Sequence, residues 1–286
     1  MQLCTVTHPT AGASTGRTFV GVVDGDEIVD LSGTYAGAVA LLVATVEDRP
    51  AVEAAVAAAP RVPVAECRFE PPIARPGKIL CVGTNYADHA AESDTVRDVP
   101  PHPVLFVRFP ESLVGHGAPI VRPAASHVFD YEGELAIVIG RTTSGVAEAD
   151  ALDAVAGYAP FMDGTIRDWQ RHTSQFTPGK NFDRSGAWGP CITTADEIDD
   201  PAALTLTTTV SGEVLQSSTT DLLIHSIPKI VSYVSTFTTL QPGDVIATGT
   251  PGGVGYARDP QRLLVPGDTV QVEISGVGAL ENTVTD

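Results

Sequence analysis

The chain has 286 residues, of which 43% are hydrophobic and 18% are charged, so it is long and apolar enough to bury a substantial core. Its formal net charge of −18 at pH 7 argues against nucleic acid and against an anionic membrane as partners. No stretch approaches the roughly eighteen apolar residues of a membrane span, and no signal-peptide pattern opens the chain, so we expect a cytoplasmic protein. An anionic substrate would therefore need a local positive centre.

Two scarce residue types limit the chemistry further. The cysteines, at positions 4, 67, 81 and 191, have no C-x-x-C spacing, which predicts neither a zinc cage nor a disulfide framework. Lysine occurs only at positions 78, 180 and 229, so each lysine is a candidate for a special role.

Residues 1–70 are predicted to form a small N-terminal α+β domain. Residues 19–29 are typical of a hairpin with an Asp-Gly turn, and alanine-rich helices are expected at residues 38–47 and 51–59. The proline-rich residues 61–76 are expected to be a linker. The second predicted domain covers residues 71–286.

A short buried strand is expected at residues 78–83, followed by a short helix over residues 84–92. His89 and Glu92 are three residues apart, so on a helix they would share one face. A carboxylate beside an imidazole orients the ring and raises its basicity, as a general base requires. Judged by itself, such a pair is more often an ordinary surface contact.

A second buried strand is predicted at residues 135–139, directly after two glutamates. Because side chains alternate across a strand, Glu132 and Glu134 should face the same side. Two carboxylates directed at an apolar interior repel each other and lose hydration, and a divalent cation with oxygen ligands relieves both costs. The alternative is a solvated strand end, and the E-x-E pattern alone does not decide between them.

Asp163 follows an expected extended segment at residues 158–162 and precedes a helix start, where capping the helix would be its ordinary role. Arg167 and Gln170 are three residues apart and would share a face of that helix. Lys180 lies in a turn-rich loop, where a lone lysine is most often solvated.

The remaining elements predict sheet and core. A hairpin is expected over residues 204–216, a helix over 230–237, and strands at 245–247 and 270–274. The glycine-rich loop 248–255 lets backbone approach a ligand closely, but it lacks the spacing of phosphate and dinucleotide loops, so nucleotide binding is rejected.

Five motifs follow one another along the chain: GTNYADH at 83–89, DYEGEL at 130–135, DGTIRDWQ at 163–170, GKNFD at 179–183 and TGTPGGVG at 248–255. In this order they resemble the fumarylacetoacetate hydrolase family, and the resemblance extends from about position 75 to the C-terminus. Among the members of that family, the chain looks most like the short acylpyruvase and 2-hydroxyhepta-2,4-diene-1,7-dioate isomerase-like bacterial proteins.

The resemblance implies a β-rich α+β fold, built as a mixed β-sandwich roll behind the small N-terminal domain, and a homodimer. It also implies one Mg²⁺ or Mn²⁺ per site, held by Glu132, Glu134 and Asp163. The fumarylacetoacetate hydrolases proper add an acidic ligand before the histidine helix, which residues 81–84 do not offer, so a three-carboxylate site is expected.

The same resemblance assigns the other site residues. His89 and Glu92 match the catalytic dyad, and Lys180 matches the site lysine. The positions that it implies for substrate binding are Tyr86, Arg167, Gln170, Gly249 and Thr250.

The chain departs from the common family pattern at Met162, at Ser211, at His225 and at Arg108-Phe109, where Lys-Pro is usual. We expect none of these departures to touch a metal ligand. We expect them to affect substrate choice or the dimer contact.

The implied function is hydrolysis of a carbon–carbon bond in a 2,4-dioxo acid of the acylpyruvate or fumarylpyruvate type, giving pyruvate and a carboxylic acid through a metal-bound enolate. His89, oriented by Glu92, would activate water, and Lys180 would stabilise the enolate. Oxaloacetate decarboxylation and 2-hydroxymuconate-type isomerisation or tautomerisation use the same enolate and stay open, although the intact dyad slightly favours hydrolysis. Each reaction takes a small anionic 2-oxo acid. A non-catalytic metal-binding scaffold is the alternative from another class.

Overall fold

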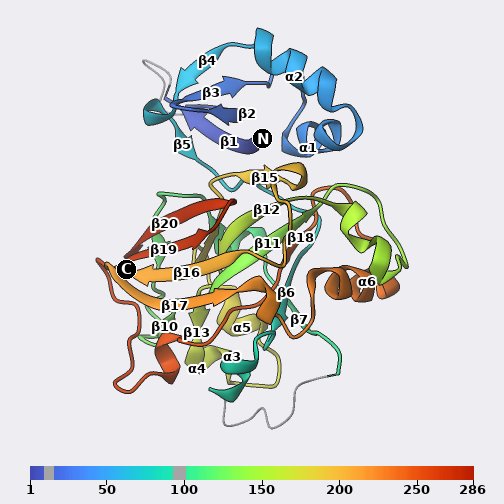
Figure 1. Ribbon diagram of the computed structural model, residues 1–286. Helices are drawn as coiled ribbons and strands as arrows, with labels where there is room; N and C mark the ends of the chain where they lie inside the picture. The colour runs from blue at the N-terminus through green and yellow to red at the C-terminus, as the bar shows by residue number, and fades with distance from the viewer. Residues whose placement is uncertain (10–15, 93–100) are drawn as a thin grey trace.

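The computed structural model describes residues 1–9, 16–92 and 101–286, and two β-sheets form most of it (Figure 1). The larger, 13-stranded sheet runs in the order β4 (Arg61–Pro63), β3 (Glu27–Asp30), β2 (Arg17–Asp24), β1 (Gln2–His8), β15 (Ile192–Thr194), β12 (Val155–Met162), β11 (Gly133–Ile139), β18 (Val245–Ala247), β6 (Ile79–Gly83) and β7 (Val104–Val107). Attached beside this path are β5 (Arg68–Phe69), β8 (Leu113–Val114) and β14 (Gly186–Trp188).

The smaller, 5-stranded sheet runs in the order β17 (Glu213–Thr219), β16 (Thr205–Val210), β19 (Thr269–Ile274), β20 (Gly278–Thr285) and β9 (Ile120–Val121), and a separate pair joins β10 (Phe129–Asp130) to β13 (Thr165–Ile166). The α-helices are α1 (Ala38–Glu47), α2 (Arg49–Ala58), α3 (Ala87–Ala91), α4 (Arg167–Gln170), α5 (Thr177–Lys180) and α6 (Ile227–Phe237). Short 3₁₀ helices span Val64–Glu66, Pro110–Ser112, Glu148–Ala154, Ala195–Glu197, Thr220–Leu222 and Gly255–Ala257.

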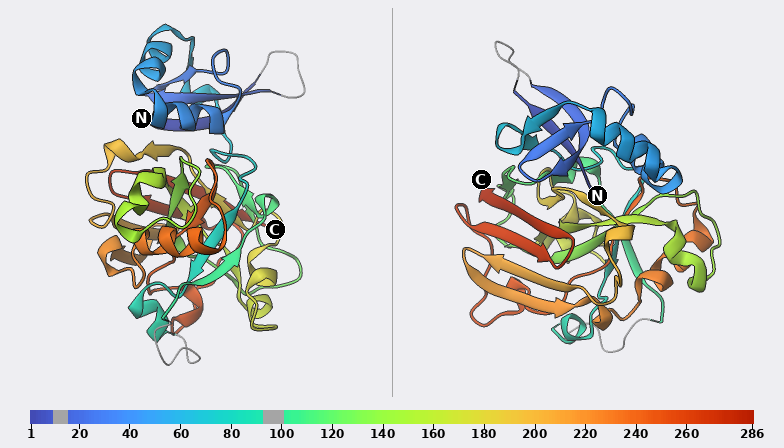
Figure 2. Two further views of the ribbon diagram at one scale, coloured as in Figure 1. Left: turned by 90° about the vertical axis from the view of Figure 1, so that its right-hand side faces the viewer. Right: turned by 45° about the horizontal axis from the view of Figure 1, so that its top comes forward.

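The main core lies between the two sheets. Strand β11 contributes Leu135, Ile137 and Ile139 to it, and the smaller sheet contributes side chains such as Leu206 and Val272. Figure 2 shows β16 and β17 (orange) and β19 and β20 (red) lying together as one layer of this sandwich. The expected β-rich α+β class with two packed sheets is confirmed.

The opposite face of β11 is buried as well. Ala136 and Val138 share a hydrophobic cluster with Leu41 and Leu42 of α1 and with Val52 of α2. Because both faces are covered, β11 carries a continuous apolar run and not an alternating pattern. The strand that carries the two glutamates is therefore held rigidly from both sides.

The N-terminal strands continue the larger sheet, because β1 pairs antiparallel with β15 through Gln2↔Thr193 and Leu3↔Ile192 (Figure 1, blue strands at the top). The division into domains 1–70 and 71–286 stays a prediction. The linker expected at residues 61–76 is wrong in part, since β4 pairs with β3 and β5 pairs with β1. Proline did not prevent this pairing because Pro63 ends an edge strand, where a missing N–H is tolerated.

The other local predictions are confirmed with adjusted boundaries. The hairpin β2–β3, helices α1, α2 and α6 and the hairpin β16–β17 all form where they were expected. The helix expected over residues 84–92 is shorter and covers Ala87–Ala91. Across the described ranges, none of the helices has the length and apolar character that crossing a membrane requires.

Candidate active site

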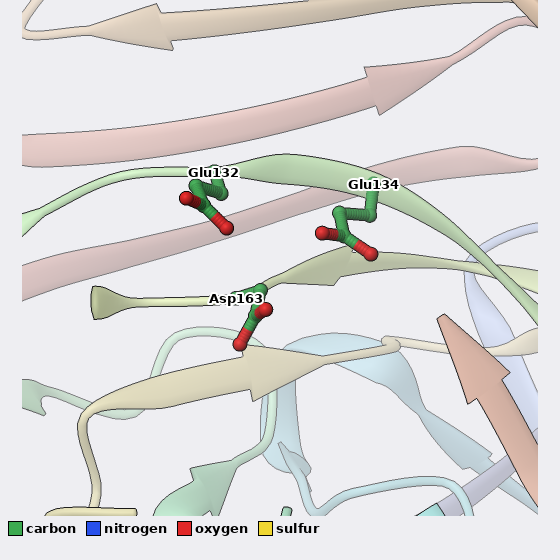
Figure 3. A group of neighbouring side chains, drawn as sticks. All are labelled: Glu132, Glu134 and Asp163. Atoms are coloured by element: carbon green, nitrogen blue, oxygen red, sulfur yellow. The ribbon is translucent and has the colours of Figure 1, made fainter. Parts of the chain in front are cut away.

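Three buried carboxylates meet where β11 and β12 run side by side. Gly133 of β11 is opposite Met162 of β12, and Asp163 follows directly, donating its backbone N–H to the Glu132 carbonyl at 2.8 Å. This register brings Glu132, Glu134 and Asp163 together, with one ligand oxygen of each lying within 4.8 Å of the others. Figure 3 shows the two glutamates leaving the same side of their strand toward the segment that carries Asp163.

Gly133 separates the two glutamates because the other side of the chain has no room for a side chain. A Cβ at this position would lie 2.0 Å from the Thr208 hydroxyl oxygen on β16. The smaller sheet thus presses against β11 from one side while the carboxylates project to the other. The E-G-E pattern reflects this close approach of the two sheets.

Two basic side chains bind the carboxylates directly. Lys180 Nζ donates to Glu132 Oε2 and to Asp163 Oδ2, at 2.6 Å each. Arg167 pairs with Glu132 at 2.7 Å and with Asp130 at 2.8 Å. Lys180 is only 1% exposed at the end of α5, so the local expectation of a solvated loop lysine is wrong.

Arg108 contacts a predicted metal ligand, so the expectation that no departure from the family pattern touches one is wrong. Its Nη1 donates to Asp163 Oδ1 at 2.5 Å and to the Gly164 carbonyl at 3.1 Å. The remaining guanidinium N–H groups bind the Ser112 hydroxyl and carbonyl and the Ser185 hydroxyl. Because the chain positions of Arg108 and Asp163 differ by 55, only the tertiary fold reveals this contact.

Burial and neighbouring charges shift two of the carboxyl groups in opposite directions. Burial would raise the pKa of Glu132, but the charges of Lys180 and Arg167 outweigh it and lower that pKa to about 2. Burial raises the pKa of Glu134 well above its usual range, and the Asp163 and Glu132 charges raise it further. Glu134 forms no ion pair with any described residue, and its Oε2 accepts only the Gly249 N–H, at 2.9 Å.

These residues fit a divalent cation. Clustered carboxylates are hard oxygen donors of the kind that such ions prefer. Counting Asp130, four buried carboxylates face the three buried cations Arg108, Arg167 and Lys180, which leaves one negative charge uncompensated when all are ionised. In addition, Arg167 Nη2 is buried and has no hydrogen-bond partner among the described residues, so it is available to an anionic ligand.

The predicted dyad is assembled on the short helix α3. His89 Nδ1 lies 3.0 Å from Glu92 Oε2, and Glu92 Oε1 accepts the Gly253 N–H at 2.5 Å. Because a carboxylate only accepts hydrogen bonds, Nδ1 carries the hydrogen, which in the neutral ring leaves the lone pair on Nε2. Asn85 anchors the start of the helix by donating to the Thr248 carbonyl at 2.7 Å. The Glu92 contact thus fixes the orientation of the His89 ring.

A cavity of about 150 Å³ connects these groups. Of the residues predicted from the sequence, it is lined by His89, Glu132, Glu134, Arg167, Gln170, Lys180 and Thr250. Asp163 and Glu92 do not line it but contact Lys180 and His89, which do. Gly249 donates its backbone N–H to Glu134 and has a φ of 106°, which favours glycine. Tyr86 is buried but does not line the cavity.

Several residues of this site were not predicted from the sequence, among them Arg108, Asp130, Phe106, Phe176 and Arg171. Asp130 accepts hydrogen bonds from Arg167 Nε and from the backbone of residues 255 and 256. Its position two residues before Glu132 is a signal that could have found it. Phe106 and Phe176 form an apolar wall with ring centroids 5.8 Å apart, for which the sequence holds no local signal.

Residues 78–285 match the profile of the domain described as "Fumarylacetoacetate (FAA) hydrolase C-terminal". The chain therefore belongs to the fumarylacetoacetate hydrolase family, which confirms the resemblance carried by the five motifs. The match begins at the strand β6 and includes every carboxylate and cation of the site.

Three similar proteins show the range of chemistry within this family. The mitochondrial oxaloacetate tautomerase FAHD2A of Bos taurus is 41% identical over 227 residues, which cover 79% of this chain and 72% of the relative. The fumarylacetoacetate hydrolase structure from Exiguobacterium antarcticum matches with a TM-score of 0.84 at 36% identity, covering 100% of this chain and 99% of its own. Maleylpyruvate hydrolase from Sphingobium sp. SYK-6, solved with manganese(II) and pyruvate, matches with a TM-score of 0.82 at 33% identity over the same shares. Family membership thus supports an enzyme with a divalent metal site, while the relatives differ in reaction.

Proposed function

We propose that the protein catalyses proton transfer at C3 of a short 2-oxo acid, and that interconversion of the enol and keto forms of oxaloacetate is its main reaction. The observation that carries this proposal is that His89, oriented by Glu92, lines the same cavity as Lys180 and the carboxylates. The cavity, at about 150 Å³, is small beside typical ligand pockets of roughly 300–1,000 Å³. A four-carbon acid suits it better than a long acylpyruvate, so the preference moves from hydrolysis, which the sequence slightly favoured, to tautomerisation.

Glu132, Glu134 and Asp163 are the residues that would hold Mg²⁺ or Mn²⁺, and the bound ion supplies a Lewis acid that acidifies the C3 hydrogen of a 2-oxo acid. Arg167 offers the substrate carboxylate its Nη2, which has no hydrogen-bond partner in the described ranges. Gln170 Oε1 accepts Arg167 Nη1 at 3.1 Å, which fixes the orientation of both side chains.

The protein moves the proton through the dyad. In the keto-to-enol direction the C3–H bond breaks, the proton passes to His89 Nε2, and the electron pair becomes the C2=C3 double bond. The proton is then delivered to the C2 oxygen, so atoms and charge balance. Glu92 stabilises the imidazolium that exists in between, and the buried Lys180 ammonium favours negative charge developing on the substrate oxygen.

The test follows the ultraviolet absorbance of enol-oxaloacetate after its addition to the purified protein with Mg²⁺, with Mn²⁺ or with a chelator. We expect metal-dependent acceleration, and a loss of about 100- to 10,000-fold in kcat for His89→Gln, which removes the base. Metal affinity should be unchanged in that variant. An unchanged rate in His89→Gln would contradict the proposed role of the dyad.

Carbon–carbon bond hydrolysis is the second candidate, favoured by the whole-length match to a maleylpyruvate hydrolase. Here His89 would take a proton from water, which attacks the distal carbonyl; the bond from C3 to that carbonyl breaks, and C3 takes up the proton. Pyruvate release from acylpyruvates, fumarylpyruvate and oxaloacetate distinguishes the candidates. Decarboxylation of oxaloacetate needs no water nucleophile, so pyruvate formation that persists in His89→Gln would identify it.

A metal-binding protein without catalytic activity is the remaining alternative. Tight metal binding with no turnover in either assay would support it and refute the enzymatic proposal. The homodimer and the cytoplasmic location stay predictions.

A further inference from the structure

Arg171 is the one cation on the cavity wall that forms no ion pair with any residue of the described ranges. Arg167 and Lys180, the other two cations there, are neutralised by Glu132 and by further carboxylates. In a chain with 35 acidic and 17 basic residues, an arginine beside a cavity would be expected to find a carboxylate. Its positive charge is therefore left for a ligand.

The Arg171 side chain is held in place without being neutralised. Its Nη1 donates to the Tyr256 hydroxyl at 3.1 Å, and its guanidinium carbon lies 4.4 Å from the centroid of the Tyr256 ring. Tyr256 is fixed in turn, because its backbone N–H donates to Asp130 Oδ2 at 3.1 Å. Asp130 also binds Arg167 Nε, so one buried carboxylate positions both arginines.

The two arginines face different parts of the cavity. Arg167 is 5% exposed and contacts the metal-site carboxylate Glu132, whereas Arg171 is exposed to solvent at the end of α4. A 2-oxo acid held at the buried carboxylates would therefore extend its distal end toward the solvent side, where Arg171 lies. The wall formed by Phe106 and Phe176 offers that distal end no polar group.

We propose that Arg171 determines substrate specificity by binding the second carboxylate of a dicarboxylic 2-oxo acid. This inference rests on the proposed function, because it takes the first carboxylate and the 2-oxo group to lie at the metal site. A guanidinium matches a carboxylate in a bidentate geometry, which makes it more selective than a point charge. The preferred substrates are thus dianions such as oxaloacetate, and not monocarboxylic acylpyruvates.

The test compares two stable probes of equal chain length, 2-oxoglutarate and 2-oxopentanoate, which differ only in a terminal carboxylate or methyl group. Equilibrium binding of each probe to the Mn²⁺-loaded protein is measured by calorimetry for the unaltered chain and for Arg171→Gln. We expect the unaltered chain to prefer 2-oxoglutarate, and Arg171→Gln to lower its affinity about 10- to 100-fold, as for the loss of a charge-assisted hydrogen bond. The affinity for 2-oxopentanoate should change less than about twofold.

Three further variants separate recognition from general effects. Arg171→Lys, which keeps the charge, should restore part of the preference, and Tyr256→Phe, which removes the hydroxyl that fixes Arg171, should lose less of it than Arg171→Gln. Arg141→Gln is the matched control, because Arg141 is an exposed arginine beyond the other end of β11 that also forms no ion pair with a described residue. It should bind both probes normally.

Equal losses for both probes in Arg171→Gln, or no loss for either, would overturn the inference. Because binding is measured separately from turnover, this result does not depend on the reaction. An inactive protein that still prefers 2-oxoglutarate through Arg171 would contradict the proposed function and support the inference. An active protein whose preference for 2-oxoglutarate does not depend on Arg171 would contradict the inference and support the proposed function.

Discussion

Arg108→Met should destabilise the protein by about 3–5 kcal/mol, because it breaks a fully buried ion pair. The side chains of Arg108 and Asp163 are both 0% exposed, with 2.5 Å between Nη1 and Oδ1. Methionine fills much of the space of the arginine stem, but Lys180 is then the only cationic partner of Asp163 among the described residues. The substitution also removes the Arg108 N–H groups that donate to the Gly164 and Ser112 carbonyls, and each buried carbonyl left without a donor costs about 1 kcal/mol or more of stability.

Equilibrium urea unfolding of the metal-free protein measures this loss as a lower midpoint at an unchanged slope. The control is Arg75→Met, which removes the ion pair between Arg75 and Glu111. This pair has a similar N–O distance of 2.9 Å, but its two side chains are 76% and 53% exposed. It should cost less than about 1 kcal/mol. If Arg108→Met costs no more than Arg75→Met, the buried Arg108–Asp163 ion pair does not contribute to stability as expected.

Three other perturbations test the site and its scaffold. Mn²⁺ binding should release protons and tighten as pH rises, because burial and the neighbouring carboxylates raise the pKa of Glu134 in the metal-free protein and the ion competes with a proton for this carboxylate; calorimetry in two buffers of different ionisation enthalpy measures the release, which Glu134→Gln should abolish. Glu132→Gln should weaken Mn²⁺ binding at least about tenfold by removing a charged ligand, and an unaltered affinity in a direct titration would disprove the ligand assignment. Gly133→Ala should lower the free energy of unfolding in urea by about 1–3 kcal/mol, since the added methyl group would collide with the Thr208 hydroxyl. Adding Thr208→Ala should recover part of this loss, whereas additive losses in the double variant would mean that the two sites do not interact.

Local patterns predicted the elements whose causes are local. The Asp-Gly turn between β2 and β3, the alanine-rich helices α1 and α2 and the apolar run of β11 depend on residues within a few positions of each other. Alternation along one strand was enough to place Glu132 and Glu134 on the same side. These features required no knowledge of the remainder of the chain.

Contacts between distant segments could not be read in this way. The register of β11 against β12 brings Asp163 beside Glu132, and no sequence pattern near Asp163 predicts that register. Arg108 and Lys180 reach the same carboxylate from different segments, although Arg108 was expected to affect only substrate choice or the dimer contact and Lys180 looked like a solvated loop lysine in its own neighbourhood. Family motifs recovered Lys180, because it lies within a shared motif, but not Arg108, which departs from the family pattern.

The site also explains how a chain of net charge −18 can bind an anion. Charges exposed to solvent are screened within about 8–10 Å at physiological salt, whereas buried charges interact through a medium of low polarisability and are screened much less. Near the cavity, Arg108, Arg167 and Lys180 are buried against four carboxylates, and a divalent ion would turn that small negative excess positive. A dianionic substrate should therefore bind more tightly once the ion is in place, because the excess carboxylate charge opposes anion binding when the ion is absent. Net charge thus serves to predict which macromolecules are unfavourable partners, whereas the balance of charges at the site decides which small molecules can bind there.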